Sequence, residues 1–216
     1  MMPDSVLARD LERNGYAIDT AFLDVESVTA LAGECRTLHA QAKLTPAAMG
    51  RAGARRLDPS RRGDSTHWLD PATPTRAQSA YWSRIEALRV ALNRELMLGL
   101  NELEAHYALY PPGSLYARHR DRFRDDDARV LSSVLYLNEN WDDDDGGALR
   151  LHLDTRPRPA LENEASVDPA AHMDVSPRSG TLVLFLSAEF EHEVLPARRE
   201  RLSIAGWFRR SGALRF

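Results

Sequence analysis

Cysteine is almost missing from this sequence, because Cys35 is the only one in 216 residues. A single cysteine excludes an internal disulfide, and it also excludes zinc sites built from several thiolates. Low cysteine use is typical of proteins kept in a reducing compartment. Since Cys35 lies among apolar residues at helical spacing, we expect it in the core rather than at a reactive site.

Long apolar runs and an excess of positive charge are missing as well. The N-terminal segment carries Asp4 and Asp10 early and has no apolar stretch of membrane-spanning length, so we expect neither a signal peptide nor a membrane span. The formal net charge is −4, which argues against binding of nucleic acid through the overall charge of the protein. We therefore expect a cytoplasmic protein without a membrane or nucleic-acid partner, and we also expect a monomer.

The first half of the chain is mostly helical in pattern. Apolar residues recur at helical spacing, and they predict helices over 4–13, from 24 to about 44, and within 74–100. Asp24 is placed to cap the second helix, while Thr75 and Gln78 form a candidate capping box for the third. Residues 15–24 are typical of a short strand and a turn.

From residue 103 the apolar residues alternate with a period of two, which indicates strands. Turn residues separate the predicted strands, which lie at 104–110, 115–121, 129–138, 148–153, 181–187, 191–196 and 201–208. Short strands joined by turns favour a mainly β fold, a sandwich or barrel with flanking helices. We expect one domain over 1–216, with helices, the first strands and a loop in 1–102 and the β core in 103–208.

The stretch "LYARHRD" carries a histidine and an aspartate two positions apart, His119 and Asp121. On a strand these two side chains would point to the same face. A second histidine, His192, follows the apolar run "TLVLFL" near the end of the chain. Two histidines and one carboxylate without cysteine match the facial triad of non-haem iron(II), although the same residue types also bind zinc. The H-E-x-x-H helix of zinc proteases does not occur in the sequence, and this favours iron.

An arginine nine residues after His192 indicates a second kind of site, one that binds a carboxylate. Arg201 begins the apolar segment "RLSIAGWF". A buried guanidinium group suits a carboxylate, because its planar fork can donate two hydrogen bonds to it. Next to a facial-triad iron, the expected carboxylate is the far end of 2-oxoglutarate. The four residues together indicate this chemistry more strongly than any one of them does alone.

Five stretches of the chain resemble the prolyl-hydroxylase group of 2-oxoglutarate and iron(II)-dependent oxygenases, and they look closest to its oxygen-sensing branch. These stretches are "RRGDSTHW", "YPPGSLYARHRD", "RVLSSVLYLNENWD", "GGALRL" and "HEVLPARRERLSIAGWF". The resemblance implies a double-stranded β-helix, a distorted jelly roll with N-terminal helices packed on one sheet. It also implies a loop over the site, from Gly50 to Thr66, and we expect this loop to be mobile until a peptide binds.

Roles for individual residues follow from the same resemblance. It implies that His119, Asp121 and His192 bind iron and that Arg201 binds the 2-oxoglutarate carboxylate. Further residues line the co-substrate pocket in this reading, namely Tyr110, Ser132, Val134 and Tyr136. Three others fall where the family meets its peptide substrate, namely Arg62, Asp64 and Arg129. Arg62 and Asp64 are also spaced to form an ion pair across a turn.

The implied activity is hydroxylation of a prolyl residue in a protein substrate, with release of succinate and CO2. Iron(II), 2-oxoglutarate and dioxygen would be required, with ascorbate as an optional reductant. One alternative is the same chemistry on a free amino acid or another small molecule. A nucleic-acid demethylase is disfavoured because Trp207 stands where those enzymes place a second arginine. A non-catalytic jelly-roll binding module is disfavoured because all four key residues are present.

Overall fold

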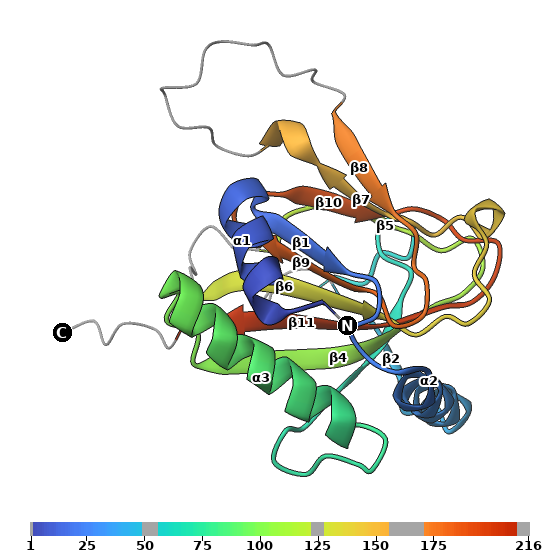
Figure 1. Ribbon diagram of the computed structural model, residues 1–216. Coiled ribbons are helices and arrows are strands. Elements are labelled where there is room, and N and C mark those ends of the chain that lie inside the picture. Colours follow the sequence, from blue (N-terminus) through green and yellow to red (C-terminus); the bar gives the residue numbers. More distant parts are fainter. Residues whose placement is uncertain (1, 49–55, 122–127, 156–170, 211–216) are drawn as a thin grey trace.

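The computed structural model describes residues 2–48, 56–121, 128–155 and 171–210 (Figure 1). Three α-helices occur in the described ranges, α1 (Asp4–Asn14), α2 (Val25–Ala40) and α3 (Ser79–Leu96). The strands are β1 (Tyr16–Asp19), β2 (Thr45–Pro46), β3 (Ser65–Trp68), β4 (Glu102–Tyr110), β5 (Tyr116–His119), β6 (Arg129–Tyr136), β7 (Leu149–His152), β8 (His172–Val175), β9 (Leu182–Leu186), β10 (Glu191–Val194) and β11 (Arg201–Arg209). Short 3-10 helices span Asp143–Asp145 and Leu153–Thr155. None of the described helices combines the length and the apolar composition that crossing a membrane requires.

Two antiparallel sheets form the body of the protein. The major sheet has the strand order β1-β9-β6-β11-β4-β3-β2, and the minor sheet has the order β5-β10-β7-β8. Figure 1 shows α1 and α3 packed along one side of the major sheet. The predicted mainly β fold with helices on one sheet is therefore confirmed.

Strand alternation divides the buried side chains between two layers. On β11, Leu202 and Ile204 belong to the cluster that packs against the three helices. The residues that alternate with them, Arg201 and Ser203, point to the other face and line a cleft. Apolar residues from both sheets fill the rest of the space between them, among them Tyr136, Leu151 and Phe185. The β11 strand therefore separates an apolar helix-facing core from an interior that holds polar groups.

The start of α2 agrees with the prediction, whereas the end of α2 and the start of α3 differ from it. The Asp24 carboxylate accepts a hydrogen bond from the Ser27 backbone N–H at 2.8 Å, which caps α2 as predicted. Helix α2 ends at Ala40 instead of near Leu44, because the next turn places Ala42 at a positive φ of 55°. Helix α3 begins at Ser79, since the Gln78 side chain donates to Glu34 on α2 and does not turn back to complete a capping box.

Three strands were not predicted, β2, β3 and β8. Each has only two to four residues. Strand β3 joins the major sheet by pairing with β4, with Ser65 opposite Leu109. It thereby carries the segment that contains Arg62 and Asp64 to the mouth of the interior.

Candidate metal and co-substrate site

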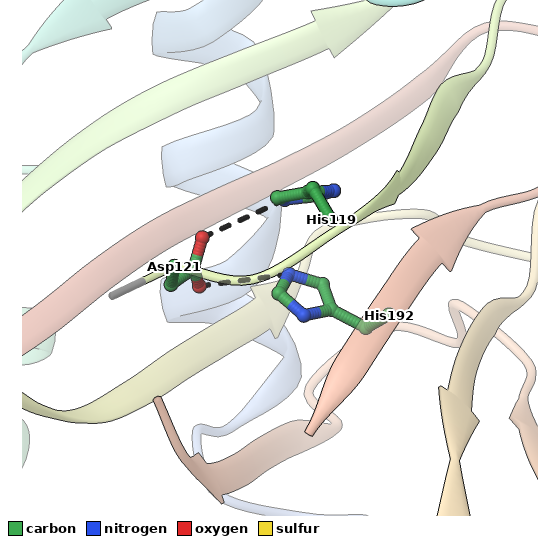
Figure 2. Close-up of side chains that lie close together, drawn as sticks. All are labelled: His119, Asp121 and His192. Atoms are coloured by element: carbon green, nitrogen blue, oxygen red, sulfur yellow. Dashed lines mark ion pairs between the residues drawn. The ribbon is translucent and has the colours of Figure 1, made fainter. Parts of the chain in front are cut away.

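Three side chains of the predicted triad meet at the open end of the interior. His119 is the last residue of β5, and the β5–β10 pairing places His192 directly opposite it. The ligand atoms of His119, Asp121 and His192 all lie within 4.8 Å of one another. One oxygen of the Asp121 carboxylate faces each imidazole, with Nε2 of each histidine 3.5 Å from its nearer oxygen (Figure 2). The two imidazole ring centres are 4.1 Å apart.

Asp121 does not lie on the strand that carries His119. Strand β5 ends at His119, and Asp121 follows in a bend. The strand predicted over 115–121 therefore ends two residues early, although the side chains of His119 and Asp121 still meet. The bend after His119 lets the carboxylate turn back toward both histidines.

Both histidines are oriented by backbone carbonyl groups. Nδ1 of His119 lies 2.8 Å from the Ala117 carbonyl oxygen, and Nδ1 of His192 lies 3.4 Å from that of Phe190. Since a carbonyl oxygen only accepts, each Nδ1 carries the proton and donates it. In a neutral ring with its proton on Nδ1, the lone pair resides on Nε2, the atom that faces Asp121, where it is available to a metal.

Electrostatics favour the protonation states that a metal site needs. Burial, together with the neighbouring His119, lowers the pKa of His192 to about 4, so the His192 ring is neutral at pH 7. Burial by itself raises the pKa of Asp121, but the two histidines and a hydrogen bond from Ser132 outweigh it and lower that pKa overall. Two imidazole nitrogens and one carboxylate are a donor set that suits iron(II), and zinc also accepts it. The three residues therefore fit a divalent metal.

Arg201 supplies a buried positive charge beside the triad. Its side chain belongs to a residue that is only 1% exposed, and its Nε donates to the Gly147 carbonyl oxygen at 2.9 Å. Within the described part of the chain no carboxylate lies within ion-pair distance of this guanidinium group. An unpaired buried cation is costly, and a small anion that reached it would offset this cost. Arg201 therefore fits one carboxylate of a ligand that the cleft admits.

A glycine makes the Arg201 anchor possible. Gly147 has a φ of 70°, and a Cβ atom there would lie 2.9 Å from Cβ of Ala197 and 3.3 Å from Cδ of Arg201. Only glycine accepts this combination of backbone conformation and close contact without strain. The sequence stretch "GGALRL" thus carries a structural requirement of the site.

A cleft of about 740 Å³ connects the triad with Arg201. Among the predicted pocket residues, Tyr110 and Val134 line this cleft, and the ring centre of Tyr110 lies 5.1 Å from the Arg201 guanidinium carbon. Tyr136 lies behind Arg201, with its ring centre 5.0 Å from the same carbon. Burial raises the pKa of Tyr136 to about 12, so its hydroxyl group keeps its proton. Ser132 is placed differently, because its hydroxyl group faces Asp121.

The residues predicted to meet a peptide lie along the same cleft. Arg62 donates to both oxygens of Asp64, at 2.8 and 3.1 Å, and Arg129 stacks on the ring of Trp207 at 3.7 Å. Arg129 also pairs with Glu104 at 2.8 Å. The predicted loop from Gly50 to Thr66 falls partly outside the described residues, and with it the expected mobility of 50–55. Its described end differs from the prediction, because Ser65 and Thr66 belong to β3.

Two aromatic contacts of the site were not predicted. The Tyr116 ring stacks on the His119 ring with centres 3.6 Å apart, and the guanidinium carbon of Arg62 lies 4.4 Å from the Tyr116 ring centre. Farther along the cleft, the ring of His106 lies 4.9 Å from that of Trp68 and 5.5 Å from that of Trp207. The sequence shows Tyr116 three residues before His119, but nothing in it signals that the two rings touch.

Comparison with known proteins finds similarity to 2-oxoglutarate and iron(II)-dependent oxygenases. The family model described as "2OG-Fe(II) oxygenase superfamily" matches residues 105–209. A prolyl-4-hydroxylase structure from Pseudomonas putida is 43% identical, covers 97% of this chain and 100% of its own, and superposes with a TM-score of 0.81. A prolyl hydroxylase from Trichoplax adhaerens, solved with a hypoxia inducible factor peptide fragment, is 25% identical over 95% of this chain and 88% of its own, with a TM-score of 0.78.

Among curated proteins, human Egl nine homolog 1 is 28% identical over 206 residues, which are 92% of this chain and 44% of the human protein. The chain thus spans less than half of that relative. The likeness to the two solved structures confirms the predicted double-stranded β-helix fold.

Proposed function

The chain belongs to the 2OG-Fe(II) oxygenase superfamily, and from this premise we propose that it hydroxylates a prolyl residue in a protein substrate. One oxygen atom of dioxygen would enter the substrate and the other would enter succinate, as 2-oxoglutarate loses CO2. The observation that carries the proposal is the meeting of a two-histidine, one-carboxylate triad with a buried arginine in one cleft. The named prolyl hydroxylases among its relatives support proline as the target.

The chain's own residues divide the work in this proposal. His119, Asp121 and His192 would hold iron(II) through two nitrogens and one carboxylate, which leaves coordination positions for ligands. Bound iron(II) supplies the redox chemistry that couples dioxygen to 2-oxoglutarate and to the substrate C–H bond. Arg201 would donate to the far carboxylate of 2-oxoglutarate, and the Gly147 carbonyl oxygen keeps its guanidinium group oriented. Tyr110 and Val134 would border the same co-substrate.

The remaining cleft would receive the substrate. Arg62, Asp64 and Arg129 line it on the side of β3, β4 and β11, and we assign them to the peptide-facing wall. Strand β3 is close to the edge of the major sheet, so this wall is open to a chain that approaches from solvent. We further propose that one oxygenase domain spans 1–216, with its jelly-roll core in 103–208, and that the protein is a cytoplasmic monomer.

The test begins with purified protein loaded anaerobically with iron(II). Succinate formation from 2-oxoglutarate should then depend on a proline-bearing peptide, and mass spectrometry should find the added oxygen on proline. A co-purification screen with the inactive Asp121→Ala protein would supply candidate peptides. Turnover stimulated by a free amino acid and by no peptide would favour the small-molecule alternative.

Variants of the triad make the test specific. His119→Ala and Asp121→Ala should each abolish turnover and weaken metal binding while the protein remains folded. His39→Ala is the matched control, because His39 is exposed on α2 and does not line the cleft. Near-normal 2-oxoglutarate-dependent activity in either triad variant would refute the metal assignment.

A further inference from the structure

The third metal ligand lacks the support that the two histidines receive from the sheet. His119 and His192 are paired residues of β5 and β10, so the backbone register holds them opposite each other. Asp121 lies beyond the end of β5, and no strand pairing fixes its position. Some other contact must hold the carboxylate toward the histidines.

A pair of buried serines makes that contact. The Ser132 hydroxyl group lies 2.7 Å from Oδ2 of Asp121, and 2.8 Å from the hydroxyl oxygen of Ser187. Ser132 is 1% exposed and Ser187 is 0% exposed. Ser132 is held in the middle of the major sheet, where β6 pairs it with Trp207 on β11 and with Phe185 on β9. The two hydroxyl groups therefore form a buried row that ends on Asp121.

The direction of the hydrogen bonds in this row follows from valence. An ionised carboxylate can only accept, and Ser132 has a single hydroxyl proton, so Ser132 must donate to Asp121. Ser132 then has only lone pairs left for Ser187, so Ser187 donates to Ser132. Two serines that only hydrogen-bonded to each other in a core could donate in either direction. The row has one order, and it runs from Ser187 through Ser132 to Asp121.

We propose that Ser132 and Ser187 are positioning residues that hold the Asp121 carboxylate so that it offers one oxygen to the metal. Ser132 engages Oδ2, while Oδ1 has no hydroxyl donor among the described residues. A carboxylate that binds through one oxygen leaves more of the metal open to other ligands than one that binds through two. The inference rests on the proposed function for its biological use, but its content is metal affinity and geometry. It also replaces the predicted role of Ser132 as a lining residue of the co-substrate pocket.

The test measures metal binding without turnover. Apo protein is titrated with cobalt(II), whose d–d absorption bands report coordination geometry, and the Kd is obtained by competition with a chelator. Loss of an outer hydrogen bond to a metal ligand typically weakens metal affinity about 10–100-fold. We expect Ser132→Ala to lose affinity in that range and to change the cobalt spectrum. Ser132→Thr keeps a hydroxyl group and should restore both, and Ser187→Ala should lose about 2–10-fold because only a neutral hydrogen bond is removed.

Ser65→Ala is the matched control, since Ser65 is a serine of the same sheet whose neighbour Thr66 faces the cleft and whose own side chain points the other way. A folded Ser132→Ala protein with an unchanged cobalt Kd and spectrum would overturn the inference. If Ser132→Ala fails to fold, Ser187→Ala decides, and a Kd within twofold of the unsubstituted protein overturns it. Cobalt binding that responds as expected in a protein that turns over no substrate would count against the proposed function alone.

Discussion

The Arg62–Asp64 pair lends itself to a quantitative prediction, because its environment is buried. The Asp64 side chain has 0% exposure and the Arg62 side chain 15%. Arg62 donates to both carboxylate oxygens, at 2.8 and 3.1 Å, and lies over the Tyr116 ring. Burial alone lowers the pKa of Arg62, but the hydrogen bonds and the charge of Asp64 outweigh it and raise that pKa overall. The pair is thus a buried, two-point contact.

Replacing Arg62 with alanine leaves the Asp64 carboxylate buried and unpaired. Breaking a buried ion pair in this way costs about 3–5 kcal/mol in the free energy of unfolding, and the partial exposure of Arg62 places the expected loss near the lower end, about 3 kcal/mol. For a chain of this size, each kcal/mol lowers the Tm by about 2–4 °C, so the expected fall is roughly 6–12 °C. Urea and thermal denaturation followed by circular dichroism would measure both quantities.

The Arg36–Glu200 pair provides the control. Its nitrogen–oxygen distance is 3.1 Å, but its side chains are 54% and 37% exposed. Arg36→Ala should therefore cost less than about 1 kcal/mol. Asp64→Asn in the Arg62→Ala background should recover part of the loss, since it removes the orphaned charge. An Arg62→Ala protein within about 0.5 kcal/mol of the unsubstituted protein would show that the pair is not desolvated and would refute the reasoning.

Three further predictions concern other buried groups. Arg201→Ala should raise the Kd for 2-oxoglutarate measured by calorimetry with a redox-inert metal, because a charge-assisted fork is lost, and an unchanged Kd would refute its role. Burial lowers the pKa of His106 to about 4, below its unfolded value of 6.5, so the unfolded state binds more protons in this window. Stability should then be complete above pH 6.5 and fall by up to about 3 kcal/mol as the pH drops toward 4, and His106→Phe should flatten this part of the pH profile. Burial raises the pKa of the Cys35 thiol to about 12, so a thiol reagent at pH 8 should react only after denaturation, and rapid labelling of the native protein would contradict this.

The sequence alone identified the elements whose signal is local. The alternation in "RVLSSVLYLN" and "RLSIAGWF" predicted β6 and β11, and Asp24 predicted the start of α2, because period and capping depend on residues a few positions apart. The chemistry of the site was also predictable by residue type. Two histidines and one carboxylate indicate a metal site and an arginine indicates an anion site, and the family resemblance pointed to the same four residues, whose roles stay predictions.

Contacts between distant segments could only come from the tertiary structure. The register of β5 against β10 brings together His119 and His192, which are 73 positions apart, and the bend after β5 returns Asp121 to them. Whether Ser132 faces a co-substrate or a carboxylate, and whether Arg62 and Asp64 pair in water or in the interior, depends on which sheet face covers them. The alternation of apolar and polar residues along a strand shows that its two faces differ. Only the packing of the second sheet decides which face becomes the interior, and that packing sets the energy of every polar group on it.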